Sequence, residues 1–161
     1  MEIRTGLSYG DALLVPQRSA VDSRSHIDLT ARLTPSLTLD TPIVSAAMDT
    51  VTEAETAAAL ADLGGLGVIH RFLSIEEQAA EVREVAEQGG PVAAAVGIDE
   101  DYLDRTEAIL EAGGDAVVLD VAHGHMERAL DAIAEIRAEY DPELIAGNVV
   151  TPDAVEDLYD S

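Results

Sequence analysis

The 161-residue sequence contains no cysteine, no lysine and no tryptophan. Without cysteine, these residues can form no disulfide, no thiolate metal site and no thiol nucleophile. Aromatic residues make up only 3% of the chain, so a core must be built from Ala, Val, Leu and Ile. Hydrophobic residues amount to 47%, which excludes a disordered tail and suffices for one domain with its own core.

Long hydrophobic runs are also missing. Residues 116–122, one of the longest apolar stretches, have the length of a strand and are too short to cross a bilayer. Residues 1–6 show neither the basic region nor the apolar region of a signal peptide. We therefore expect a cytoplasmic protein with no membrane partner.

Positive charge is scarce. Nine basic residues, all of them arginine, stand against 32 acidic ones, which gives a formal net charge of −23. A nucleic-acid partner would require the opposite sign, so we expect none. The acidic residues fall between apolar helix positions, for example between Ile75 and Val85, as on a solvated helix face. We interpret this charge as an adaptation to a salt-rich cytosol, where ions screen the self-repulsion.

Short apolar runs with little polar alternation predict strands that are buried on both faces. They span residues 42–47, 67–69, 92–97, 116–122 and 144–149. Helix signals lie between them. Residues 52–55 and 74–77 fit the capping box, the glycine pairs at 89–90 and 113–114 follow helical runs, and Thr151-Pro152 begins a last helix. Alternating strands and helices with short connections indicate parallel βαβ units.

Two architectures fit this alternation, a doubly wound open sheet and a closed barrel. No G-x-G-x-x-G motif follows a predicted strand, which weakens the dinucleotide-fold alternative. Residues 1–41 form a non-repetitive segment before the first strand. No linker and no second domain are evident in the sequence.

Polar or glycine-rich groups follow three of the predicted strands, where a (β/α)8 barrel has its active site. The segments are residues 45–53, 119–125 and 146–151. In the second, Asp120 can accept two hydrogen bonds from a ribose diol or simply cap a loop. In the third, the Asn148 amide can donate to a substrate or close a turn. The first, taken alone, reads as a strand and a capped helix.

Together these segments resemble the IMP dehydrogenase/GMP reductase family. Residues 7–16 look like its N-terminal signature, 42–53 like its first strand and 64–71 like its second, while the Asp120 and Asn148 segments match the fourth and fifth. The resemblance covers the whole chain in order and favours the barrel. We expect an α/β fold, a partial TIM (β/α)8 barrel of about five parallel β/α units, with residues 1–161 forming the N-terminal part of the catalytic barrel.

The resemblance also implies roles for individual residues. Asp120, Val121 and Ala122 would line the nicotinamide-dinucleotide site, where Asp120 accepts from ribose hydroxyls. Met48 would pack beside the base of a purine nucleoside monophosphate, and Asn148 would hydrogen-bond in the substrate pocket. Dehydrogenases of the family often have serines after this aspartate, so Val121 and Ala122 are closer to the bacterial reductases.

No catalytic residue is expected in these 161 residues. In the family, the catalytic cysteine attacks purine C2, and that cysteine, the catalytic base and a monovalent-cation site lie beyond the fifth β/α unit. The chain therefore resembles a barrel truncated before the cysteine loop, inactive alone, whose complete form would be a homotetramer. His123 and His125 lack a defined third ligand, so we expect no metal site. His70 either faces the active site or has a structural role.

The resemblance leaves the reaction open between two oxidoreductases. The absence of the regulatory CBS insertion near residues 82–90 and the segment 18–30 favour a GMP reductase, which converts GMP to IMP with NADPH. Residues 45–53, 64–70 and 93–97 are more similar to the dehydrogenase, which oxidises IMP to XMP with NAD in guanine nucleotide synthesis. We favour the dehydrogenase. A third possibility is a non-catalytic truncated remnant.

Overall fold

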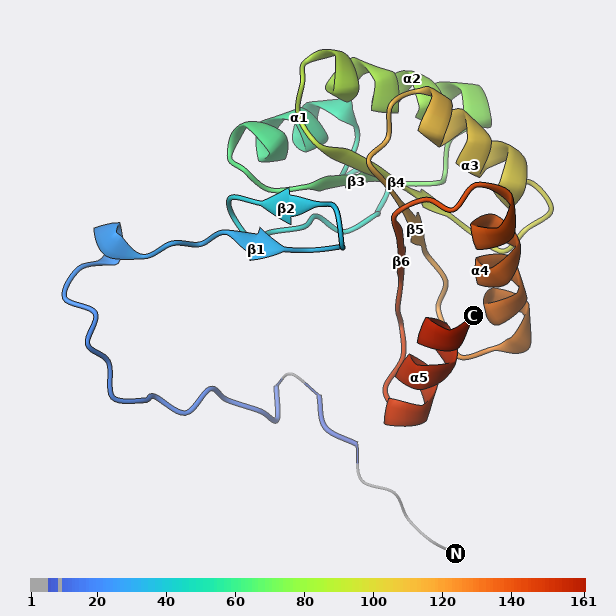
Figure 1. The fold of residues 1–161 in the computed structure, drawn as a ribbon. Coiled ribbons are helices and arrows are strands. Elements are labelled where there is room, and N and C mark those ends of the chain that lie inside the picture. Colours follow the sequence, from blue (N-terminus) through green and yellow to red (C-terminus); the bar gives the residue numbers. More distant parts are fainter. Residues whose placement is uncertain (1–5, 9) are drawn as a thin grey trace, which may run out of the picture.

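The computed structural model describes residues 6–8 and 10–161. Tyr9, which belongs to the proposed N-terminal signature, lies outside the described residues, as do residues 1–5. An extended segment leads through the short 3-10 helix η1 (Arg24–His26) into an antiparallel hairpin of β1 (Ala31–Arg32) and β2 (Thr38–Leu39). Alternating helices and strands follow up to the C-terminus (Figure 1).

The main sheet consists of four parallel strands. They are β3 (Gly67–Ile69), β4 (Val92–Val96), β5 (Ala116–Leu119) and β6 (Leu144–Ala146). Their spatial order is β3-β4-β5-β6, the same as their order in the chain. A doubly wound sheet would reverse direction around a central strand, which does not occur in this sheet. The α/β fold and the partial-barrel arrangement are thus confirmed.

The first predicted strand, residues 42–47, forms only one isolated parallel bridge, between Val44 and Leu66. Leu66 N donates to Ile43 O at 3.0 Å, and Ser45 N donates to Leu66 O at 3.0 Å. The next ladder position is filled by a side chain, because Val68 N donates to the Ser45 hydroxyl at 2.9 Å. Residues 42–47 therefore lie beside β3 in the expected direction. The regular strand predicted there is not formed.

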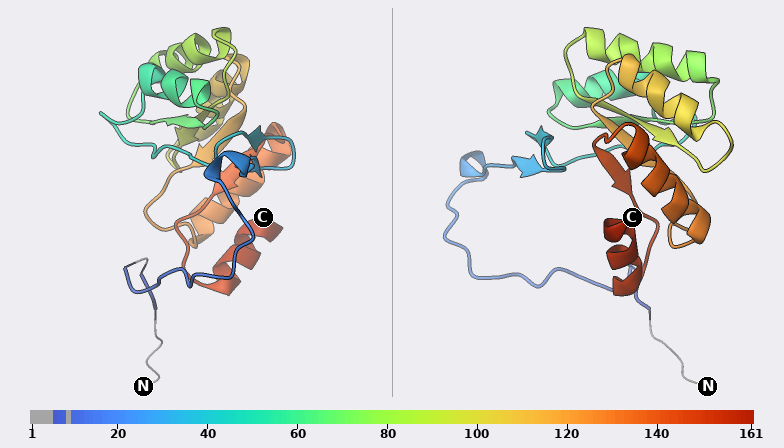
Figure 2. Two further views of the ribbon diagram at one scale, coloured as in Figure 1. Left: turned by 90° about the vertical axis from the view of Figure 1, so that its left-hand side faces the viewer. Right: turned by 45° about the vertical axis from the view of Figure 1, so that its right-hand side comes forward.

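Five α-helices accompany the strands in the part of the chain that the structure describes. They are α1 (Ala54–Asp62), α2 (Ile75–Glu87), α3 (Tyr102–Glu111), α4 (Glu127–Glu139) and α5 (Pro152–Asp160). Helices α1 to α4 cover one face of the sheet, and the β1–β2 hairpin lies toward the other (Figures 1 and 2). Alternate residues of β4 serve the two faces: Val92, Ala94 and Val96 pack with the helices, whereas Ala93 and Ala95 pack with Leu39.

Most of the predicted helix ends are confirmed. Ser74 and Glu77 form a complete capping box at the start of α2, and Thr151 accepts from Ala154 N at the start of α5. Gly89 and Gly113 adopt φ values of +82° and +97° after α2 and α3, in the region that favours glycine.

The capping box predicted at residues 52–55 is wrong. The Thr52 side chain is fully buried and its hydroxyl donates to Ala46 O at 2.8 Å, so it cannot cap α1. Helix α1 starts after Glu53, which makes no side-chain cap hydrogen bond. Its first free amide, Ala54 N, donates instead to the Glu81 carboxylate of α2. A tertiary contact thus replaces the local cap.

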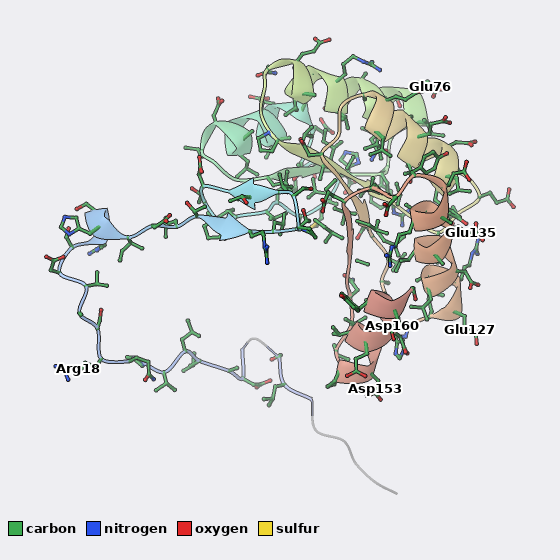
Figure 3. All side chains as sticks on the ribbon, viewed as in Figure 1. Arg18, Glu76, Glu127, Glu135, Asp153 and Asp160 are labelled. Atoms are coloured by element: carbon green, nitrogen blue, oxygen red, sulfur yellow. The ribbon has the colours of Figure 1, made fainter. Side chains whose placement is uncertain are left out.

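The acidic side chains gather on the outer helices. Glu76 of α2 and Glu127 and Glu135 of α4 are exposed and lie away from the sheet (Figure 3). This placement agrees with the solvated helix faces inferred from the sequence. Within the described residues, none of the helices combines the length and the apolar character that crossing a bilayer would require.

Candidate functional site

The segments that follow the carboxyl ends of the parallel strands form what we call the strand-end rim. It comprises Met48, residues 70–72 after β3, 97–99 after β4, 120–125 after β5 and Asn148 after β6. Because the strands are parallel, these segments lie at the same edge of the sheet. The rim contains all five site residues proposed from the sequence.

Asp120 is held by its main chain, and its carboxylate is partly exposed. Its N–H donates to Val96 O at 2.9 Å, which fixes the residue against β4. The side chain is 36% exposed, so a ligand can reach it. Val121 is buried and packs into the core on the helix side of the sheet, whereas Ala122 is exposed. Asp120 and Ala122 therefore present their side chains at the rim, and Val121 anchors the segment.

Asn148 lies beside the Asp120 segment. It has a left-handed backbone, with φ of +58°, and its carbonyl oxygen accepts from Gly124 N at 3.1 Å. A side chain at Gly124 would overlap the carbonyl oxygen of Gly147, so the two loops pack backbone to backbone. The structure thus brings the Asp120 and Asn148 segments together.

Met48 stands on the other side of the rim. The residue is 55% exposed, and its carbonyl oxygen accepts from Val51 N and Thr52 N at 3.2 and 3.1 Å, which closes the turn before α1. Among the described residues, no hydrogen bond or salt bridge joins Met48 to Asp120 or Asn148. A ligand that touched all three would have to span the rim.

Two histidines of the rim, His70 and His125, have local hydrogen-bonding partners. His70 is only 2% exposed, its Nδ1 accepts from Phe72 N at 3.1 Å, and its Nε2 lies 3.3 Å from a Glu53 carboxylate oxygen. These contacts favour a structural role for His70 over a place facing the active site. His125 Nε2 lies 2.7 Å from Asp157 Oδ2 of α5, and its ring is 6.5 Å from that of His123.

Arg71 was given no role from the sequence, although it is central to the rim. Its Nη1 lies 3.5 Å from Asp99 Oδ2, and its Nε lies 3.7 Å from Asp120 Oδ2. The guanidinium carbon is 5.1 Å from the centre of the Phe72 ring, a cation–π geometry. Arg71 follows β3 as Asp120 follows β5, so the rule that identified Asp120 would also have found it.

A buried polar link supports this half of the rim. The fully buried Gln78 amide of α2 donates to His70 O at 3.0 Å and to Ala95 O at 2.9 Å. Arg105 of α3 orients that amide, because its Nη1 donates to Gln78 Oε1 at 3.0 Å. The carboxyl ends of β3 and β4 are therefore tied to each other and to two helices.

A large groove lies elsewhere. It has a volume of about 820 Å³ and is located beside β6, between the β1–β2 hairpin and α5. Its lining is mainly apolar and includes Ile133, Leu144, Val155 and Leu158. Strand β6 is the last strand of the sheet, and all three of its residues are half-buried. We place the candidate site at the strand-end rim because the polar groups converge there, whereas the groove follows an unpaired strand edge.

Comparisons with known proteins identify the family of the chain. The chain matches the IMP dehydrogenase / GMP reductase domain over residues 6–161. The inosine-5'-monophosphate dehydrogenase of Borreliella burgdorferi is 32% identical over 206 residues, covering 96% of this chain and 51% of the relative. That of Cryptosporidium parvum is 32% identical over 202 residues, covering 99% and 50%. That of Nitrosopumilus maritimus is 28% identical over 283 residues, covering 98% and 60%.

The chain thus spans about half the length of the curated relatives it matches. Over that half, the parallel strands follow in sequential order and the polar groups stand at their carboxyl ends. The similarity extends over nearly all the residues of the chain. The chain belongs to the IMP dehydrogenase / GMP reductase domain family.

Proposed function

We propose that these 161 residues form the cofactor side of the active site of a purine-nucleotide oxidoreductase, which oxidises IMP to XMP with NAD. The single observation that carries the proposal is the partly exposed Asp120 carboxylate, held at the strand-end rim beside the Asn148 loop. The relatives described above, each an inosine-5'-monophosphate dehydrogenase, support this reaction.

The residues present fit a dinucleotide. A carboxylate can accept hydrogen bonds from both hydroxyls of a ribose, as acidic residues do in other dinucleotide sites. Asp120 Oδ2 faces Arg71, and Oδ1 makes no hydrogen bond to any of the described residues. Ala122 adds exposed surface next to it. When bound, the nicotinamide ring would supply the hydride acceptor, and Asp120 would hold the ribose.

For the substrate, we propose that Met48 packs beside the purine base and that Asn148 donates a hydrogen bond. Oxidation at purine C2 moves a hydride to NAD and places the oxygen of a water molecule on that carbon. In this family the step uses a cysteine, and the chain contains none. We therefore expect no catalytic residue among these residues. From the family resemblance we also propose that the monovalent-cation site lies outside them and that the complete enzyme is a cytoplasmic homotetramer.

GMP reduction with NADPH is the second candidate. It is favoured by Val121 and Ala122, which offer no hydroxyl next to Asp120. The two candidates differ in the nicotinamide cofactor that they use.

Calorimetric titration of the purified chain with NAD+ and with NADPH tests the proposal. Preferential binding of NAD+ that is weakened in Asp120→Asn supports the dehydrogenase, and preferential binding of NADPH supports the reductase. Because no cysteine is present, neither IMP with NAD+ nor GMP with NADPH should give turnover. A chain that binds neither cofactor would be the non-catalytic remnant, and the proposed function would be wrong.

A further inference from the structure

We propose that Arg71 is a positioning residue of the dinucleotide site, which acts by orienting the Asp120 carboxylate. The inference rests on the proposed function, since it assigns Arg71 a role in the same site. Arg71 itself need not touch the ligand. Its guanidinium lies between the loops that follow β3, β4 and β5, and it contacts an acidic residue in each of the last two.

The position of Arg71 is set by its surroundings. Nη1 is held by the Asp99 carboxylate, and the guanidinium lies over the Phe72 ring. Gly97 makes room for it, because a Cβ atom at that position would lie 3.0 Å from Nη1 and 3.2 Å from the guanidinium carbon. The Arg71 side chain is only 26% exposed. Packing therefore leaves the guanidinium little freedom to turn away from Asp120.

The Nε atom of Arg71 is the functional end of this arrangement. It is buried and has no hydrogen-bond partner among the described residues. The nearest acceptor is Asp120 Oδ2, at 3.7 Å, which is slightly beyond hydrogen-bond distance. A small movement of the Asp120 side chain would satisfy Nε. That movement fixes one carboxylate oxygen on Arg71 and leaves the other for the ribose hydroxyls.

Charge adds a second reason for an arginine here. The chain carries a net charge of −23, and two carboxylates, Asp99 and Asp120, lie at this point of the rim. A dinucleotide brings a negative diphosphate. The Arg71 guanidinium offsets part of the repulsion that the ligand would meet. If Arg71 orients the Asp120 carboxylate, its effect on binding depends on Asp120. If Arg71 only offsets the negative charge of the ligand, its effect does not depend on Asp120, so an experiment can separate the two contributions.

The test measures NAD+ binding to the full 161-residue chain by calorimetry. The variants are Arg71→Gln, Arg71→Lys, Asp120→Asn and the double variant that combines Arg71→Gln with Asp120→Asn. Arg83→Gln is the matched control, since it removes the same charge from the exposed face of α2. We expect Arg71→Gln to weaken binding about tenfold, the loss typical of a contact to a charged group. Arg71→Lys should recover part of that loss, and Arg83→Gln should bind as the wild type does.

The double variant decides between orientation and other roles. If Arg71 acts through Asp120, Arg71→Gln should weaken binding no further once Asp120→Asn is present. Additive losses, or equal losses in Arg71→Gln and Arg83→Gln, would overturn the inference. Should Arg71→Gln fail to fold, as judged by circular dichroism, Arg71→Lys keeps the positive charge and lacks the Nε donor, and full NAD+ binding by that variant would overturn the inference. A wild-type chain that does not bind NAD+ refutes the proposed function instead.

Discussion

Replacing Gln78 by glutamate replaces a buried NH2 donor with a carboxylate oxygen. That donor links α2 to the carboxyl ends of β3 and β4. The Gln78 Nε2 group donates to His70 O and Ala95 O at 3.0 and 2.9 Å, with Ile69 O at 3.4 Å. A carboxylate oxygen in its place would face these carbonyl oxygens and could donate to none. The other oxygen would keep the contact with Arg105 Nη1. The substitution thus removes donation while keeping size and position.

The expected cost follows from these contacts. Two lost hydrogen bonds cost about 1 kcal/mol each, and leaving buried acceptors unpaired beside a carboxylate adds about 1–3 kcal/mol. Stronger pairing with Arg105 offsets part of this. We therefore expect Gln78→Glu to lower the free energy of unfolding by about 3 kcal/mol at neutral pH. A protonated carboxyl can donate one bond, so the folded chain should hold that proton more tightly than the unfolded chain does. The loss should shrink as the pH falls toward about 4.

Urea unfolding followed by circular dichroism measures this loss. Gln88→Glu is the matched control, because Gln88 is exposed at the end of the same helix and its Nε2 donates only to Glu84 O. The control should change the free energy of unfolding by less than about 0.5 kcal/mol. Equal effects of the two substitutions, or a loss at Gln78 that grows as the pH falls, would refute the reasoning.

Further predictions concern the loops and the helix ends. Gly124→Ala should lower the free energy of unfolding by about 1–3 kcal/mol in urea titrations, because the new Cβ would overlap Gly147 O, whereas Gly147→Ala has open space and should be close to neutral. Ser74→Ala removes half of the capping box of α2 and should cost about 1 kcal/mol by the same assay. The pKa of Tyr102 is raised from 10.0 to about 12. The largest cause is the hydrogen bond from its hydroxyl to Glu135, and burial and the negative charge of Glu135 add smaller contributions. Because this pKa is raised in the folded chain, the stabilisation is present below about pH 10 and is lost as the pH rises toward about 12. Melting temperatures of Tyr102→Phe should lack that alkaline step, and a step that persists would contradict the assignment.

The sequence allowed most of the fold to be predicted because its local signals agree with its tertiary contacts. The box at Ser74 and Glu77 forms since both partners are close in the chain and exposed. The box predicted around Thr52 fails because a distant contact prevails: Glu81 takes the Ala54 amide, and the Thr52 hydroxyl turns inward to Ala46. Side-chain competition also reduced the first strand to a bridge, where Ser45 accepts from Val68 N.

For the candidate site, the sequence indicated which segments meet but not how their side chains pair. Parallel strands placed Asp120 and Asn148 at one edge, and the contact of Gly124 with the Asn148 carbonyl joins their loops. The part played by Arg71 depends on space beside Gly97 and on a distance to Asp120, neither of which a single sequence contains. The ligands assigned to Met48, Asp120 and Asn148 remain predictions.

The proposed function requires NAD+ to bind at the strand-end rim. Amide chemical shifts of the isotope-labelled chain, recorded by NMR during titration with NAD+, test it most directly. We expect saturable shifts around Arg71, Gly97, residues 120–124 and Asn148, with weaker binding in Asp120→Asn but not in Asp153→Asn on α5. Shifts confined to the groove beside β6, around Leu144, Val155 and Leu158, or no saturable shifts at all, would contradict it.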